Sequence, residues 1–149
     1  MNIKEQLYNQ CLEFVETRFQ TIKNTINEIQ ESLTSETKSS AGDKHETGRA
    51  MLQLEREKAG NQLAEIQKVK EALSRIDVDK TSTQIGLGSV VYTTQANYFI
   101  AISAGALHLD SKTYYAISPS TPIANLLLSK SAGENVIFRG NTIKINQIL

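Results

Sequence analysis

The chain has 149 residues, of which 40% are hydrophobic and 21% charged, and its sixteen basic and sixteen acidic side chains cancel. This length allows one ordinary domain or two small ones. A neutral chain is a poor candidate for holding nucleic acid by charge alone, so a role on nucleic acid would depend on another protein. There is no apolar run of the roughly 20 residues that a membrane span needs. The first residues do not resemble a secretory signal, and Cys11 has no second cysteine to pair with, so we expect a cytoplasmic protein without membrane contacts.

The first half of the chain has the periodicity of a helix. Its apolar residues recur at alternating steps of four and three, a seven-residue repeat that gives a helix one narrow apolar seam. The absence of proline before Pro119 also favours helix here. The first seam consists of Leu7, Cys11, Val15, Phe19, Ile22, Ile26, Ile29 and Leu33, and the second of Leu52, Ala59, Leu63, Ile66, Leu73 and Ile76.

A small, polar stretch at residues 35–43 separates the two seams and predicts a turn. Two seamed helices joined by a short turn fold back on each other, so residues 1–78 predict an antiparallel helical hairpin with its tip at about residues 36–47. Arms of about 30 residues would reach roughly 45 Å. Such a long pair buries little apolar surface per residue, which suggests that its purpose is to place the tip far from the base.

The second half, residues 79–149, predicts a small antiparallel sheet of about five strands, because β-branched and aromatic residues concentrate there. A hydroxyl at Thr121 followed by Pro122 predicts the start of a short helix, with the hydroxyl as its cap. The whole chain is thus expected to be of the α+β class. The expected strands cover 88–94, 97–103, 113–118, 134–139 and 142–148, residues 107–111 are expected to form a loop, and Ile123, Leu126, Leu127 and Leu128 are expected to form the buried face of the helix.

Two stretches resemble the Gre family of bacterial transcript-cleavage factors. Residues 117–130 (ISPSTPIANLLLSK) and 133–136 (GENV) are similar to a stretch of the family's C-terminal domain, and residues 42–46 (GDKHE) to the acidic tip of its hairpin. The resemblance covers nearly the whole chain but is dense only at the tip and in residues 113–149. It implies an FKBP-like C-terminal domain. The chain differs from the family pattern at Thr121, where serine is usual, at Ser129, where glycine is usual, and at residues 47–50 (TGRA).

The resemblance also implies a function and a partner. In the Gre family the hairpin enters the secondary channel of RNA polymerase, and tip carboxylates help to hold a second Mg²⁺ in the polymerase's own active site, where backtracked RNA is cut. Asp43 and Glu46 match these carboxylates. Magnesium prefers hard oxygen ligands and is often held by only one or two carboxylates, with phosphate and water completing its shell. On this basis the protein would be a monomer and would not itself be an enzyme. It would have no cofactor or small-molecule substrate of its own, and it would contact nascent RNA only through the polymerase.

The spacing of the two acids has a second explanation. Asp43 and Glu46 also form a near capping box, in which each side chain accepts a backbone N–H at the start of the second helix. Both roles can coexist, because a carboxylate has several lone pairs. Lys44, His45 and Arg49 are candidates for contacts with RNA phosphates or acidic polymerase residues, or for solvated charges on an exposed turn.

Three other functions remain open from the sequence. The altered residues after the tip are compatible with a Gre-like regulator that occupies the channel without promoting cleavage. An FKBP-like domain suggests a prolyl isomerase, although aromatic residues are only 6% of the chain and tryptophan is absent. A narrow apolar seam is also compatible with a structural coiled coil that assembles with a second hairpin.

Overall fold

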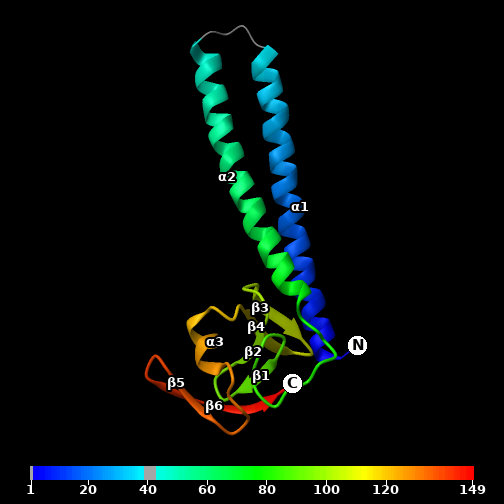
Figure 1. Cartoon of the computed structure of the whole chain (residues 1–149), viewed down its shortest axis with the longest axis vertical. Helices are drawn as coiled ribbons and strands as arrows, with labels where there is room; N and C mark the ends of the chain where they lie inside the picture. Colours follow the sequence, from blue (N-terminus) through cyan, green and yellow to red (C-terminus); the bar gives the residue numbers. More distant parts are fainter. Residues whose placement is uncertain (1, 39–42) are drawn as a thin grey trace. The chain divides into compact units, whose positions relative to one another are not determined.

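The computed structural model describes residues 2–38 and 43–149, and the side chains of residues 2–35 and 47–149. Helix α1 covers Ile3–Lys38 and helix α2 covers Asp43–Ser74. The strands and the short helix follow in the order β1 (Val90–Thr93), β2 (Asn97–Ile100), β3 (Gly105–Leu109), β4 (Lys112–Ile117), α3 (Pro122–Leu127), β5 (Asn135–Phe138) and β6 (Asn141–Ile148). The predicted α+β class, with long helices followed by a sheet that carries one short helix, is confirmed (Figure 1).

The chain forms two compact units. One contains residues 15–70, which are the two arms of the helical hairpin. The other contains residues 1–14 and 71–149, so the ends of both helices belong with the sheet. The division of the sequence at residue 78, and an FKBP-like fold for the second half, stay predictions.

The sheet differs from the predicted one in strand number and in direction. It has six strands in the order β3-β4-β2-β1-β6-β5, and β2 pairs with β4 in parallel. The additional strand is β3, whose last three residues overlap the loop expected at residues 107–111. Its sequence, GALHL, has no β-branched or aromatic residue, so propensity alone does not indicate it. A turn at Asp110 and Ser111, both with positive φ, joins β3 to β4 as in a two-residue hairpin.

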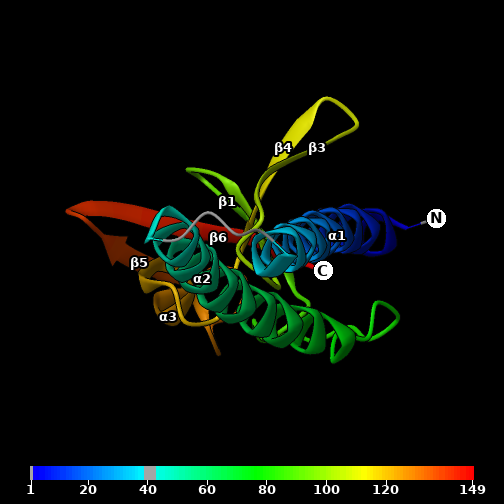
Figure 2. The same cartoon turned by 90° about the horizontal axis from the view of Figure 1, so that it is seen from above.

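The core of the second unit lies between the sheet and α3. Its buried residues come from β1, β2, β5, β6, α3 and the segment before β1, and α3 lies beside β5 and β6 (Figure 2). Leu127 and Ala124 supply the buried face of α3, whereas Leu126, which was expected to be buried, is exposed. The core cluster consists of Ile85, Val91, Ile100, Ala124, Leu127, Val136, Ile143 and Ile145.

The start of α3 also differs from the prediction in detail. Thr121 is the N-cap residue, as expected, but its side chain makes no capping hydrogen bond. Its hydroxyl donates instead to the carbonyl of Ser118, at 2.8 Å. Pro122 occupies the first turn, where a missing N–H costs nothing.

Candidate functional site

The hairpin unit is held together near its turn by a small apolar cluster. Ile29 and Leu33 of α1 pack with Ala59 of α2, and Ile26 and Leu52 cover them. Ala59 is 3% exposed, and its small side chain allows the two helices to approach closely. These residues belong to the predicted seams, so the structure confirms the antiparallel pairing that the seams indicated.

Polar contacts tie the two arms together at both ends of the hairpin unit. Near the turn, Nη1 of Arg49 donates to the carbonyl of Leu33 at 3.2 Å. At the other end, Nζ of Lys70 lies 2.8 Å from a carboxylate oxygen of Glu16 and 5.0 Å from the ring centroid of Phe19. The contact of Arg49 crosses from one helix to the other, so its guanidinium helps to hold the arms together near the C-terminal end of α1. Its predicted contact with RNA or polymerase stays a prediction.

The predicted tip residues lie at the start of α2. Asp43 is the first residue of this helix, and Glu46 follows three residues later, so their positions fall on one face of its first turn. Anionic side chains are favoured at this end of a helix by its macrodipole. The side chains of Asp43, Lys44, His45 and Glu46 lie outside the described residues. Their roles as metal-holding carboxylates and partner contacts therefore stay predictions.

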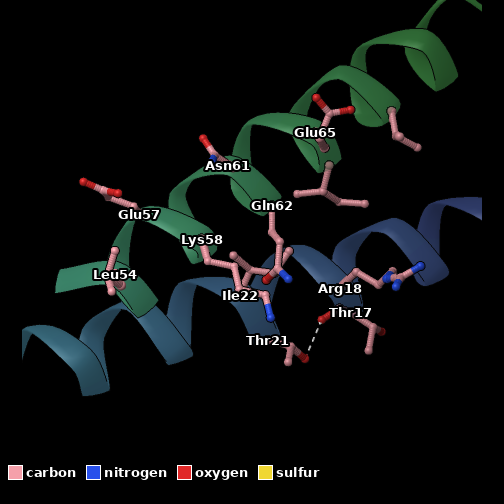
Figure 3. Close-up of a pocket in the computed structure, with 12 residues that line it drawn as sticks. Thr17, Arg18, Thr21, Ile22, Leu54, Glu57, Lys58, Asn61, Gln62 and Glu65 are labelled. Carbon is pink, nitrogen blue, oxygen red and sulfur yellow. Dashed lines mark hydrogen bonds between the residues drawn. The ribbon is translucent and has the colours of Figure 1, made fainter. Parts of the chain in front are cut away.

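A groove of about 940 Å³ runs along one face of the hairpin unit. Lys58 and Gln62 of α2 extend toward α1, whereas Glu57, Asn61 and Glu65 project from the side of α2 that faces away from α1 (Figure 3). Within α1, the hydroxyl of Thr21 donates to the carbonyl of Thr17 at 2.9 Å, the dashed line in this view. The lining residues are Thr17, Arg18, Thr21, Ile22, Leu54, Glu57, Lys58, Asn61, Gln62, Glu65, Ile66 and Val69.

Cys11 is a buried core residue, as predicted from its place on the first seam. Burial raises the pKa of its thiol to about 12. A thiol that stays protonated at neutral pH is a poor nucleophile, so Cys11 is structural. Among the described residues, no group of three or more metal-ligating side chains is found.

His108 lies in strand β3 rather than in a loop. Its Nδ1 is 3.2 Å from the hydroxyl of Thr113, and its carbonyl accepts a hydrogen bond from Nε2 of Gln10 at 3.0 Å. The side chain of His108 thus makes a cross-strand contact within the β3–β4 hairpin. The loop expected at residues 107–111 did not predict this contact. This contact explains the position of His108 without a catalytic role.

The neighbouring tyrosines Tyr114 and Tyr115 contribute to sheet packing. Tyr114 is buried, and its hydroxyl lies 3.1 Å from that of Tyr92, with the two rings at 75° to each other. Tyr115 is partly exposed on the other face of β4 and packs against Tyr98. Because the two side chains point to opposite faces of the strand, they cannot form one platform for a stacked base.

The stretch that resembles the Gre family contains one informative backbone position. Ser129 has a φ of 67°, in the left-handed region where glycine is favoured. Its N–H donates to the carbonyl of Ile85 at 2.8 Å. Glycine is usual in the family at this position, so the sequence difference is compatible with the same backbone conformation.

Comparisons with known proteins add little to these observations. No family model matches the chain, and no curated protein matches it. Among solved structures, that of the transcription factor Gfh1 aligns over 95% of this chain and 92% of its own chain, with 20% sequence identity and a TM-score of 0.34. This likeness is too weak to assign a fold family or a function. In the part of the chain that the structure describes, no helix is long and apolar enough to cross a membrane.

Proposed function

We propose that this protein is a transcription elongation factor of the Gre type, which binds bacterial RNA polymerase and stimulates the polymerase to cleave backtracked RNA. The observation that carries the proposal is that α2 begins at Asp43, within residues 42–46, which resemble the acidic Gre tip. Asp43 and Glu46 therefore both belong to the first turn of a long helix. The glycine-like backbone of Ser129, in the second stretch that resembles the family, supports the same assignment.

The dimensions of the hairpin suit insertion into a narrow channel. From Lys70 to Asp43, α2 has 27 residue steps, which corresponds to a reach of roughly 40 Å. Over this length the unit consists of two helices, so its width is close to that of a helix pair, roughly 20 Å. The apolar cluster at Ala59 and the contact from Arg49 keep the arms paired close to the turn. A stiff support of this kind would hold the tip residues in place.

The chemistry proposed for the tip needs few protein ligands. In two-metal hydrolysis, a second divalent ion stabilises charge on the attacking and leaving oxygens of the phosphodiester. Asp43 and Glu46 would contribute oxygen ligands to a Mg²⁺ ion whose remaining ligands come from the polymerase, the RNA and water. The protein would then have no catalytic activity alone, and it would act on nascent RNA only inside the complex. Lys44 and His45 are the nearest candidates for contacts with RNA phosphates.

The test is transcript cleavage by a purified polymerase stalled in a backtracked complex. Asp43→Asn and Glu46→Gln keep the size of each side chain and remove its charge, so each is expected to abolish stimulated shortening of the RNA while binding to the polymerase persists. Glu55→Gln, on an exposed position three turns along α2, is the matched control and should leave cleavage unchanged. Full stimulated cleavage by both tip variants would refute the proposed roles.

The second candidate is a Gre-like regulator that occupies the channel without stimulating cleavage. It is favoured by residues 47–50 (TGRA), which depart from the family pattern immediately after the tip, and by Arg49, whose guanidinium contacts Leu33 within the hairpin. In the same assay this regulator would bind the polymerase and slow RNA synthesis with no shortening of the transcript. Shortening by the unmodified protein would exclude it.

A further inference from the structure

Helix α2 carries large apolar side chains beside the groove that the hairpin does not bury. Leu54 is 66% exposed and Met51, one turn earlier, is 60% exposed. Both apolar seams are used inside the chain, where α1 packs against α2, so these residues are not needed to join the arms. Exposed apolar residues beside a groove are typical of a surface that binds another molecule.

The groove presents a regular stripe on α2. Leu54, Lys58, Asn61, Glu65 and Val69 follow each other at steps of four, three, four and four residues, which places them on one face of the helix. The stripe extends over 15 residue steps, or roughly 22 Å. It thus offers four turns of one helix to a partner helix, with the groove between the arms beside it (Figure 3).

This stripe is complementary to itself when it is reversed. If a second α2 runs antiparallel about a twofold axis between Asn61 and Gln62, Leu54 lies opposite Val69 and Lys58 lies opposite Glu65, because each pair is equally far from the axis. The symmetry of an isologous dimer produces each contact twice. Two apolar contacts and two pairs of opposite charges would result, with Asn61 nearest the axis.

The charges of the groove also favour a second copy over a partner of one sign. Its charged lining residues are two cations, Arg18 and Lys58, and two anions, Glu57 and Glu65, which cancel. A strongly acidic or basic partner would leave half of them opposite like charges. We infer that this face of the hairpin is a homodimerisation surface, in which α2 of a second copy packs antiparallel along the groove from Leu54 to Val69.

The dimer is weak and depends on concentration. A stripe of four turns is short compared with stable interfaces, which bury about 1,200–2,000 Å² in total. Its association is therefore expected in the micromolar range rather than the nanomolar range. This inference does not rest on the proposed function.

Charge reversal on the full-length chain tests the inference by sedimentation equilibrium. Lys58→Glu alone and Glu65→Lys alone each place like charges opposite each other twice, and each should raise the dimer dissociation constant about tenfold or more. The double variant Lys58→Glu/Glu65→Lys restores both pairs and should dimerise again. Both positions are solvent-exposed, so far-UV circular dichroism should show unchanged helix content.

Mixing the two single variants gives the sharper result. The Lys58→Glu chain is acidic at both positions of the charged pair and the Glu65→Lys chain is basic at both, so a mixed dimer has opposite charges in both pairs. The mixture should therefore form heterodimers although neither variant self-associates. Glu31→Lys, on an exposed position of α1 away from the groove, is the control and should dimerise like the unmodified protein. A monomer at all concentrations up to about 1 mM, or no rescue in the double variant and the mixture, would overturn the inference.

Discussion

The replacement Gly88→Ala gives a quantitative test of how the second unit is packed. Gly88 has a φ of 89°, and its N–H donates to the carbonyl of Ile100 at 2.6 Å. A Cβ atom at this position would lie 3.1 Å from Cγ2 of Ile76, a buried residue just after α2. The methyl group would thus be strained by its backbone conformation and would also press on a neighbour that has little room to move.

The expected loss of stability is the balance of three contributions. A non-glycine residue in the left-handed region costs about 1–2 kcal/mol. Crowding in a packed interior typically adds about 1–3 kcal/mol, and here the lower end applies because only one atom pair is tight. Alanine also restricts the unfolded chain, which returns about 0.4–1 kcal/mol. The net expectation is a decrease of about 2 kcal/mol in the free energy of unfolding of the second unit.

Tyrosine signals provide the assay, because all five tyrosines of the chain belong to residues 1–14 and 71–149. Urea unfolding followed by near-UV circular dichroism therefore reports this unit. Gly86→Ala is the matched control, since a Cβ atom there meets nothing within 4 Å, and its effect should be small or slightly stabilising. In an Ile76→Ala background the cost of Gly88→Ala should fall to its backbone part alone. An equal effect at Gly86 and Gly88 would refute the reasoning.

Four further predictions concern single positions. Ser129→Gly should raise the free energy of unfolding by up to about 1 kcal/mol in urea titrations, because glycine relieves the positive φ; a clear loss would contradict this. Gly60→Ala should stabilise α2 by about 0.5–1 kcal/mol, measured by thermal melts in the far-UV, since only the flexible end of the Arg56 side chain lies near the added methyl group. The thiol of Cys11 should react with iodoacetamide far more slowly in the folded protein than in urea, and equal alkylation rates would contradict its burial. Because burial raises the pKa of this thiol, its contribution to stability is full below about pH 9 and is lost as the pH rises toward 12. Leu54→Gln should leave the unfolding free energy within about 0.5 kcal/mol while it weakens dimerisation in sedimentation, and a large loss of stability would show that Leu54 is a core residue.

The helical half of the fold follows closely from the sequence. The seam residues near both ends of α1, such as Leu7, Val15 and Leu33, are buried as predicted. Phe19, Ile22 and Ile26, in the middle of the same seam, are only half-buried. A heptad pattern identifies the side of a helix that is apolar, but two helices alone cannot enclose every residue on that side.

The sheet was less predictable, because pairing depends on contacts that are distant in sequence. Strand β3 has weak intrinsic strand propensity and is held by its register with β4 from Leu109 opposite Lys112 to Gly105 opposite Ala116. In the sheet, β4 lies between β3 and β2 and pairs with β2 in parallel. No local pattern in residues 105–109 carries this information, which explains why β3 was not predicted and why a loop was expected at residues 107–111.

The candidate site also has one part that the sequence predicts and one part that it does not. The start of α2 at Asp43 was predictable, since the second seam and the polar residues before it are local signals. Of the predicted turn, residues 35–38 belong to α1, and residues 39–42 lie outside the described residues. The groove was not predictable, because it combines residues of two helices and depends on which face of α2 stays uncovered. Seam residues repeat on one side of α2, whereas Leu54, Lys58, Glu65 and Val69 repeat on an adjacent side that looks merely mixed in sequence.

The stripe from Leu54 to Val69 is complementary to itself when it is reversed, and this property is the basis of the proposed dimer. Lys58 and Glu65, and likewise Leu54 and Val69, lie at equal distances from one point between Asn61 and Gln62, whereas the seam that pairs the arms lies on another side of α2. A single helix would then serve three purposes. The seam pairs the arms, the stripe from Leu54 to Val69 pairs two chains, and the first turn carries Asp43 and Glu46. Because the charge-reversal variants change only the stripe and the Asp43 and Glu46 variants only the first turn, association and transcript cleavage can be altered one at a time in the same protein.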